Sequence, residues 1–260
     1  MSADAQFQDA CPILKYLGVY STGYGRIDVQ HARSRGIAVT NVADYSTDSV
    51  AELVVGIAIA ELRNLSREQA RAANGDVSET SFQGRTLRSM TIGVIGMGHI
   101  GTRLAKVMAE GFGSTVLYWS RHRREAIESS LIKFTDLDEL FAQSDVISIH
   151  LAANSLTEGL VNKQRIARLK SGAILINTAP NDIVDLEAVF SSCRDGSLRY
   201  AMDHADELSY LNYSDLRATP NVTIYPPIGY ATRDATEKRQ EMLISNIESY
   251  IEGQFQNRLV

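Results

Sequence analysis

Three closely spaced glycines in the middle of the chain constrain its fold more than any other feature. They follow the apolar run Thr91 to Ile95 in the pattern G-x-G-x-x-G, as Gly96, Gly98 and Gly101. Apolar residues then recur at helical spacing, and a second apolar run comes after them. These are Ile100, Leu104, Val107 and Met108, followed by Thr115 to Trp119. This order of strand, glycine turn, helix and strand predicts the first half of a dinucleotide-binding βαβ unit.

Each glycine has a separate physical role in such a unit. Gly96 permits the tight turn, Gly98 lets the backbone approach a pyrophosphate, and Gly101 lets the helix pack closely on the strand. The start of the helix, at His99 and Ile100, presents free N–H groups and a partial positive charge to the phosphates. The alternative is a glycine-rich turn in an ordinary α/β domain.

The end of the second strand indicates which dinucleotide is bound. NAD sites of this type place Asp or Glu there to accept hydrogen bonds from the ribose. This chain instead has Ser120, followed by Arg121, His122, Arg123 and Arg124. A hydroxyl leaves room for a 2′-phosphate, and guanidinium groups bind phosphate through paired hydrogen bonds. We therefore expect NADP(H), bound by Ser120, Arg121 and Arg124. A solvated basic helix start would leave the missing carboxylate unexplained.

Composition excludes several other classes of protein. The 260 residues are 44% hydrophobic and carry a net charge of −5, which argues against a nucleic-acid partner. No apolar run reaches the length of a membrane span, and the first residues lack a basic and then apolar signal pattern. The two cysteines and five histidines show no metal-ligand spacing. We expect a cytoplasmic protein without a metal site.

Strands and helices are predicted to alternate along the chain. Strands are expected at 13–20, 37–42, 91–95, 115–119, 145–150, 173–177, 198–202 and 222–224, and helices at 28–35, 49–62, 136–143, 162–170, 184–194 and 232–252. The helix at 49–62 opens with the capping box Ser49-Val50-Ala51-Glu52. Residues 64–90 are polar and are expected to form a linker or arm. Alternating strands and helices predict an α/β fold with a doubly wound parallel sheet.

Several motifs, in order along the chain, resemble the D-2-hydroxyacid dehydrogenase family, which includes glyoxylate and hydroxypyruvate reductases. The run Leu14 to Val19 and the following Ser21-Thr22-Gly23-Tyr24 are similar to the family's loop for the substrate carboxylate. Tyr118-Trp119-Ser120-Arg121 resembles its NADPH-using reductases. Further similar segments lie at 39–42, 45–47, 49–52, 144–151, 157, 173–179, 221–222, 226 and 231–233.

The resemblance implies a Rossmann domain for NADP(H) at 47–230 and a flavodoxin-like substrate domain at 1–46 with 231–260, with a cleft between them. It implies a homodimer formed through the cofactor domain, and hydride transfer between nicotinamide and C2 of a small 2-oxo or 2-hydroxy acid. Cofactor contacts are implied beyond the glycine turn, at His150, Leu151, Thr157, Thr178, Ala179 and Asp203. Substrate contacts are implied at Ser21, Thr22, Gly23 and Tyr45.

The sequence departs from the family at the three catalytic positions. The family uses an arginine for the carboxylate, a histidine as proton donor and a glutamate that holds the histidine. Those positions hold Pro180, Pro227 and Leu208 here, and a slip of one residue would offer Glu207 for the glutamate. Proline has neither a titratable group nor an N–H donor. The catalytic residues therefore stay unknown, and ordinary 2-oxo-acid reduction is the least favoured function.

The chain also begins close to the segment equivalent to Leu14, which predicts a truncated substrate domain with one βαβ unit and the C-terminal helix. Three functions stay open. The first is a repurposed NADP(H)-dependent oxidoreductase acting on a carbonyl, imine or enone. The second is a non-catalytic NADP(H)-binding sensor or partner protein, and the third a redox-neutral enzyme. Candidate groups for catalysis are Tyr24, Arg26, His204, Asp206, Glu207, Tyr225 and Tyr230.

Overall fold

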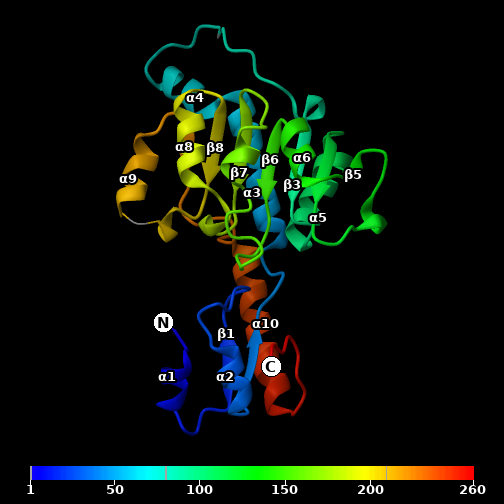
Figure 1. The fold of residues 1–260 in the computed structure, drawn as a ribbon, viewed down its shortest axis with the longest axis vertical. Helices are drawn as coiled ribbons and strands as arrows, with labels where there is room; N and C mark the ends of the chain where they lie inside the picture. The colour runs from blue at the N-terminus through cyan, green and yellow to red at the C-terminus, as the bar shows by residue number, and fades with distance from the viewer. Residues whose placement is uncertain (1, 80, 209) are drawn as a thin grey trace. The chain divides into compact units, whose positions relative to one another are not determined.

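The computed structural model describes residues 2–79, 81–208 and 210–260. The chain divides into two compact units, Thr47–Gly229 and Met1–Ser46 with Tyr230–Val260 (Figure 1). We call these the larger and the smaller unit and describe each by itself. No helix among the described residues is long and apolar enough to cross a membrane.

The larger unit is built on a seven-stranded sheet in which every pair of neighbours is parallel. The strand order is β5-β4-β3-β6-β7-β8-β9, so the chain goes outward from β3 in one direction and then in the other. The strands are β3 (Thr91–Ile95), β4 (Thr115–Trp119), β5 (Ile132–Phe134), β6 (Val146–Ile149), β7 (Ala173–Asn177), β8 (Leu198–Met202) and β9 (Val222–Ile224). The reversal between β3 and β6 is the topological switch point at which such sheets bind ligands.

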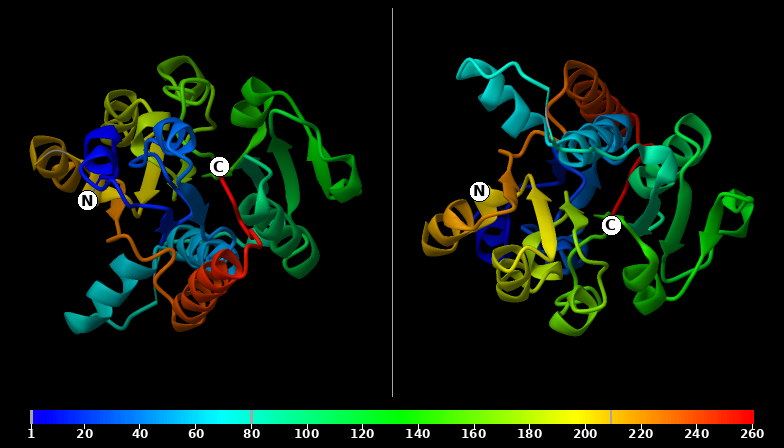
Figure 2. Two further views of the ribbon diagram at one scale, coloured as in Figure 1. Left: turned by 90° about the horizontal axis from the view of Figure 1, so that it is seen from below. Right: turned by 90° about the horizontal axis from the view of Figure 1, so that it is seen from above.

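Helices cover both faces of this sheet (Figure 2). On one face lie α3 (Thr47–Arg63) and α5 (His99–Lys106), which continues as a π-helical turn (Val107–Gly111). On the other lie α6 (Leu137–Gln143), α7 (Lys163–Ile166), α8 (Leu186–Arg194) and α9 (Tyr210–Ala218). Alternate strand residues bury toward opposite layers: Val94 packs with α3 and α5, whereas Ile95 packs with α6 and its neighbours. The expected doubly wound Rossmann-type sheet is confirmed.

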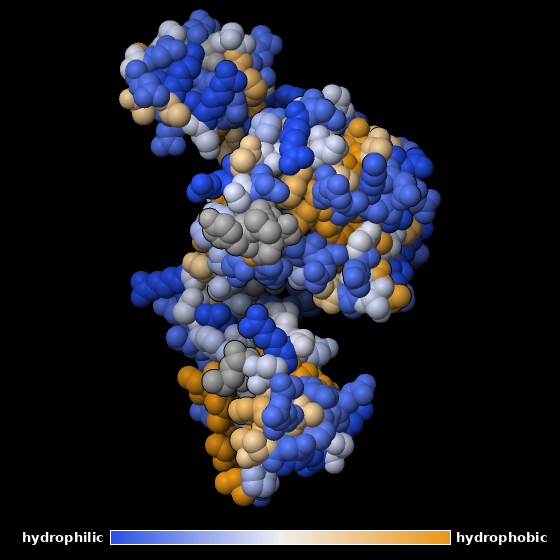
Figure 3. Space-filling model, turned by 60° about the vertical axis from the view of Figure 1, so that its left-hand side comes forward, coloured by the Kyte–Doolittle hydropathy of each residue, from blue (hydrophilic) through white to orange (hydrophobic). Residues whose placement is uncertain are grey.

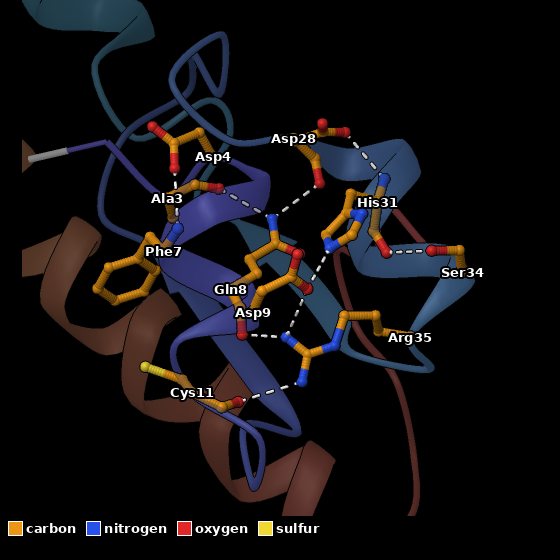
Figure 4. A network of polar contacts seen from close by, with 10 residues as sticks. All are labelled: Ala3, Asp4, Phe7, Gln8, Asp9, Cys11, Asp28, His31, Ser34 and Arg35. Atoms are coloured by element: carbon orange, nitrogen blue, oxygen red, sulfur yellow. Dashed lines mark hydrogen bonds and ion pairs between the residues drawn. The ribbon is translucent and has the colours of Figure 1, made fainter.

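The smaller unit contains two parallel strands and three helices. The elements are α1 (Ala5–Asp9), β1 (Tyr16–Val19), α2 (Val29–Ser34), β2 (Ala38–Asn41) and α10 (Arg233–Ile251). A polar network joins α1 to α2 (Figure 4): the amide nitrogen of Gln8, which is fully buried, donates to the carbonyls of Ala3 and Asp28, while His31 contacts Asp9 at 2.8 Å. Helix α1 has only five residues and little apolar surface, so these polar contacts hold it against α2.

Some predicted boundaries were wrong. The helix expected at 49 begins at Thr47. Asp48 lies in its first turn, where a negative charge is stabilised by the positive end of the helix dipole, and Asp48 also pairs with Arg103 of α5. Helix α7 ends at Ile166 rather than at 170. The strands expected at 13–20, 37–42 and 145–150 are each shorter, at Tyr16–Val19, Ala38–Asn41 and Val146–Ile149.

Other elements were not predicted at all. The polar segment 64–90 contains α4 (Leu65–Ala73), none of whose residues is buried, and a short 3-10 turn (Leu87–Ser89). We call residues 64–79 and 81–86 the arm; the face of it seen at the top of Figure 3 is mostly hydrophilic. Helix α4 is mostly polar, with Leu65 as its one large apolar residue, and this composition led to the prediction of a linker. Strand β5 is only three residues long, α1 is five, and α9 buries Leu216 against the core.

Candidate functional site

The glycine turn after β3 is sterically constrained at two of its three glycines. Gly96 has φ of +98°, and a Cβ there would collide with the backbone carbonyl of His150 at the end of β6. A Cβ at Gly101 would collide with the carbonyl oxygen of Gly96. Gly98 differs, because it is the N-cap of α5 and a Cβ there would meet nothing within 4 Å. The turn therefore leaves open space at a helix N-terminus, where a phosphate group would be stabilised.

A buried tyrosine fixes the loop that follows β4. The Tyr118 hydroxyl donates to Glu128 Oε1 at 2.8 Å and accepts from the Arg124 backbone N–H at 2.9 Å. Arg123 binds both carboxylate oxygens of Glu128 at 2.7 Å, and its hydrogen bonds lower the pKa of Glu128 to about 2. Sequence analysis named Tyr118 only as part of the segment 118–121 and missed its role and Glu128, although a buried tyrosine in a strand requires a partner for its hydroxyl.

The same contacts separate the basic residues of this loop. Arg123 is engaged by Glu128, whereas Arg121 and Arg124 are exposed and form no ion pair among the described residues. Ser120, between them and β4, donates its hydroxyl to the carbonyl of His122 at 2.7 Å. Two cationic side chains at the end of β4 are thus available to an external anion.

At the end of β6, His150 is held as a neutral imidazole. Its Nε2 lies 2.9 Å from the Ser148 hydroxyl, and burial of the ring lowers the pKa of His150 to about 4. Leu151 packs partly buried against the core. Thr157 closes the following turn, since its hydroxyl donates to the Ala152 carbonyl at 2.7 Å and accepts from the Asn154 N–H at 2.9 Å. These residues supply a neutral edge beside the glycine turn.

Two buried polar atoms without partners lie after the neighbouring strands β7 and β8. Thr178 Oγ1 follows β7, and Asp203 Oδ1 follows β8; both are buried and lack a hydrogen-bond partner. The other oxygen of Asp203 accepts the Gly229 N–H at 3.0 Å, and burial raises the pKa of this carboxyl, which is 2% exposed. Buried polar groups are almost always satisfied, so an unmatched pair indicates a ligand with polar hydrogens. Next to Thr178, the Ala179 N–H donates to Asn177 Oδ1 at 3.0 Å.

A histidine lies between two carboxylates at this end of β8. His204 Nε2 is 3.7 Å from Asp203 Oδ1, and His204 Nδ1 is 3.5 Å from Glu207 Oε1. Asn181 fixes the group from the β7 side, because its backbone N–H donates to Glu207 Oε2 at 3.2 Å and its amide donates to the His204 carbonyl at 2.6 Å. The group thus places one imidazole beside two carboxylates.

The three residues expected at the family's catalytic positions also lie in the larger unit. Pro180 precedes the 3-10 turn Asn181–Ile183, and Leu208 packs partly buried against the core. Pro227 lines an open groove of about 530 Å³ beside α9 and β9. The other residues lining the groove are Ala205, Asp206, Tyr213, Arg217, Val222, Ile224, Tyr225 and Pro226.

The substrate residues suggested by resemblance lie in the smaller unit, in the segments after β1 and β2. The Ser21 hydroxyl donates to the Gly23 carbonyl at 2.7 Å, and the Thr22 hydroxyl to the Val42 carbonyl at 3.2 Å. Asn41 on β2 donates to the Thr22 carbonyl at 2.9 Å, which holds this loop against the strand. Tyr45 is 8% exposed. Among the described residues, no group of three or more His, Cys, Asp or Glu side chains could hold a metal ion.

Comparison with known proteins agrees with this geometry. The family model for the D-isomer specific 2-hydroxyacid dehydrogenase NAD-binding domain matches residues 55–229. Glyoxylate reductase from Thermococcus litoralis is 32% identical over 266 residues, covering 99% of this chain and 80% of that protein. The chain thus spans about four-fifths of this relative.

Two solved structures are similar over nearly the whole chain. D-lactate dehydrogenase from Aquifex aeolicus, complexed with NAD and lactic acid, has a TM-score of 0.86 and 30% identity, covering 95% of this chain and 79% of that one. An acyclic imino acid reductase in complex with NADPH and D-Arg has a TM-score of 0.91 and 28% identity, covering 100% and 83%. This chain belongs to the D-isomer specific 2-hydroxyacid dehydrogenase family, whose members here are oxidoreductases with nicotinamide cofactors.

Proposed function

We propose that this protein is an NADP(H)-dependent oxidoreductase that reduces a C=N or C=O group of a small molecule. The observation that carries the proposal is the pair of unmatched buried atoms, Thr178 Oγ1 and Asp203 Oδ1, on adjacent strands of a family fold whose glycine turn is open to phosphate. The carboxamide of nicotinamide has N–H groups that could donate hydrogen bonds to these two oxygen atoms.

The residues of the larger unit fit each part of this cofactor. The N-terminus of α5 at Gly98 and His99 would bind the pyrophosphate, and Thr178, Ala179 and Asp203 would bind the carboxamide. Arg121 and Arg124 would bind the 2′-phosphate, because their charges are not neutralised among the described residues, and Ser120 would lie beside it. When bound, the cofactor supplies a hydride.

His204 is the proposed source of the proton that accompanies the hydride. Asp203 and Glu207 both lie beside its ring, and Asn181 holds Glu207 and the His204 backbone in place. Imidazole is the side chain that enzymes use most often for general acid–base catalysis. This arrangement would replace the family histidine, whose position holds Pro227.

An imine is the favoured substrate group. The supporting observation is the likeness to the imino acid reductase structure complexed with NADPH and D-Arg, at a TM-score of 0.91. The second candidate is a non-catalytic NADP(H)-binding protein, favoured by the prolines at positions 180 and 227. A panel of 2-oxo acids, each with and without ammonia or an alkylamine, separates the two. NADPH consumption that requires the amine supports imine reduction, whereas binding without consumption of any panel member supports the second candidate.

The cofactor assignment is tested by titrating NADPH and NADH against the fluorescence of Trp119, the single tryptophan of the chain, which ends β4. Arg121→Ala is expected to weaken NADPH binding by about tenfold or more and to leave NADH nearly unchanged, because only NADPH carries the 2′-phosphate. Lys133→Ala removes an exposed charge on neighbouring β5 and is the matched control. An equal loss for both cofactors would contradict the assignment.

A further inference from the structure

In the smaller unit, three tyrosine rings surround the guanidinium of Arg239. Its Cζ lies 4.1 Å from the ring centre of Tyr20, 5.2 Å from Tyr45 and 5.7 Å from Tyr230. Tyr20 follows β1, Tyr45 follows β2, Tyr230 precedes α10, and Arg239 lies on α10. Segments distant in the sequence therefore meet at one cationic side chain.

Arg239 lies on the inner face of α10. Ala235, one turn before it, is 2% exposed, and Asn246, two turns after it, is 1% exposed. Residues at these spacings share one side of a helix. Placing a charge on such a face costs free energy unless a partner compensates it.

No carboxylate within the described part of the chain supplies that compensation. Arg239 forms no ion pair there, and its Nε is buried without a hydrogen-bond partner. Burial raises the pKa of the Tyr45 phenol, against the opposing effect of the Arg239 charge, so this phenol is neutral at physiological pH. The adjacent Lys238 donates to the backbone carbonyl of Asp44 at 2.9 Å and adds a second positive charge.

We infer that Arg239, with Tyr20, Tyr45 and Tyr230, forms a binding site for the carboxylate of a small organic acid. Aromatic rings attract the face of a guanidinium, so its N–H donors lie at the edge. Arg239 also hydrogen-bonds the Tyr45 phenol, and its Nε has no partner. A carboxylate matches that edge through two parallel hydrogen bonds. Tyr20 and Tyr230, at the outside of the group, are 39% and 37% exposed, and the loop Ser21 to Gly23 begins directly after Tyr20.

This site would give the protein a carboxylate-binding arginine although the family position for one holds Pro180. Assigning the bound carboxylate to the substrate rests on the proposed reductase function. The binding itself does not, because all four side chains belong to the smaller unit. The test therefore measures binding without turnover.

The probe is oxamate, a non-reducible analogue of 2-oxo acids, measured by equilibrium dialysis with and without NADPH. Arg239→Met is expected to weaken oxamate binding by about ten- to a hundredfold, the range for a charge-assisted hydrogen-bonded contact. Arg239→Lys should lose less, because it keeps the charge and loses the paired donors. The matched control is Arg233→Met on the same helix, where the side chain is 88% exposed, and it should bind as the wild type does. The neutral analogue oxamide should bind none of these proteins measurably.

A measurement on the wild-type protein covers the case in which Arg239→Met fails to fold. Phenylglyoxal modifies arginine, and mass spectrometry of peptides reports each site separately. Oxamate should protect Arg239 and leave Arg233 unprotected. The inference is wrong if wild-type protein does not bind oxamate, if folded Arg239→Met binds it equally well, or if Arg239 is not protected. Failure of the cofactor proposal would instead appear as absent NADPH binding in the Trp119 titration, with oxamate binding intact.

Discussion

At the scale of single residues, the larger unit concentrates its unusual ionisable groups after the carboxyl ends of the strands. Glu128 is strongly acidic because Arg123 and Tyr118 donate to it, His150 is neutral, and Asp203 is buried with one unmatched oxygen. Perturbed ionisation of this kind gathers at functional sites in proteins. Here it also has consequences for stability.

The low pKa of His150 predicts how stability depends on pH. The folded protein takes up this proton only near pH 4, whereas the unfolded chain takes it up near 6.5, so between these values the unfolded state binds more protons. The contribution of His150 is therefore complete above pH 6.5 and is lost as the pH falls toward 4, a change of about 2–3 kcal/mol. Urea unfolding followed by Trp119 fluorescence measures it.

His150→Gln should flatten this part of the pH profile, since glutamine does not titrate. His122→Gln replaces an exposed histidine and should retain the wild-type slope between pH 4.5 and 6.5. A slope that persists in His150→Gln would show that another group carries the proton uptake.

At the scale of the element, two glycines of the turn between β3 and α5 are expected to have different roles, one in stability and one in nucleotide binding. Gly101 has no room for a Cβ, whereas Gly98 faces open space at the helix N-terminus. Close packing penalises an added methyl group only where an atom already occupies the position. Replacement by alanine should thus reduce stability at Gly101 and nucleotide binding at Gly98.

Gly101→Ala is expected to destabilise the larger unit by about 1–3 kcal/mol, because the new methyl group meets the Gly96 carbonyl. Gly98→Ala should preserve stability and weaken nucleotide binding, since its methyl group would take the space expected for the pyrophosphate. Thermal unfolding without cofactor and the Trp119 titration measure the two effects. If Gly98→Ala binds NADPH as tightly as the wild type, the pyrophosphate does not lie there.

At the scale of the whole molecule, the arm combines an exposed helix with two exposed apolar side chains. Helix α4 buries none of its residues, and Leu65 and Val77 are 49% and 83% exposed. A helix without a core contact is marginal in isolation. We therefore propose that the arm contributes to the homodimer contact implied by the family resemblance.

Light scattering should give twice the chain mass of 28.6 kDa for the wild-type protein. Replacing both Leu65 and Val77 with Glu should shift the measured mass toward that of the monomer at micromolar concentration. Each apolar side chain buried in a dimer contact would contribute about 1.5–3 kcal/mol to the free energy of association. Ile13→Glu alters an apolar residue that is 88% exposed in the smaller unit and should keep the wild-type mass. A monomeric wild-type protein would refute the proposal.

The sequence by itself determined the parts of this protein that depend on neighbours along the chain. Strands β3, β4, β7, β8 and β9 have the predicted bounds, because continuous apolar runs between turns leave few other places for a parallel strand. The glycine pattern located the turn after β3, since its constraints act within a few residues. Helix α4 was missed because its sequence is mostly polar and Leu65 is its one large apolar residue.

Only the tertiary structure decided which polar groups meet and which lack partners. His204 gains its position between Asp203 and Glu207 partly through Asn181 from the neighbouring strand, and Arg239 meets tyrosines from three other segments. Asp203, His204 and Glu207 are close together in the sequence, but neither their contact with Asn181 nor the tyrosine group around Arg239 has a spacing that a sequence pattern could reveal. Burial removes water as the alternative hydrogen-bond partner, so the ionisation and unmet bonding capacity of these groups depend on contacts that exist only after the chain has folded.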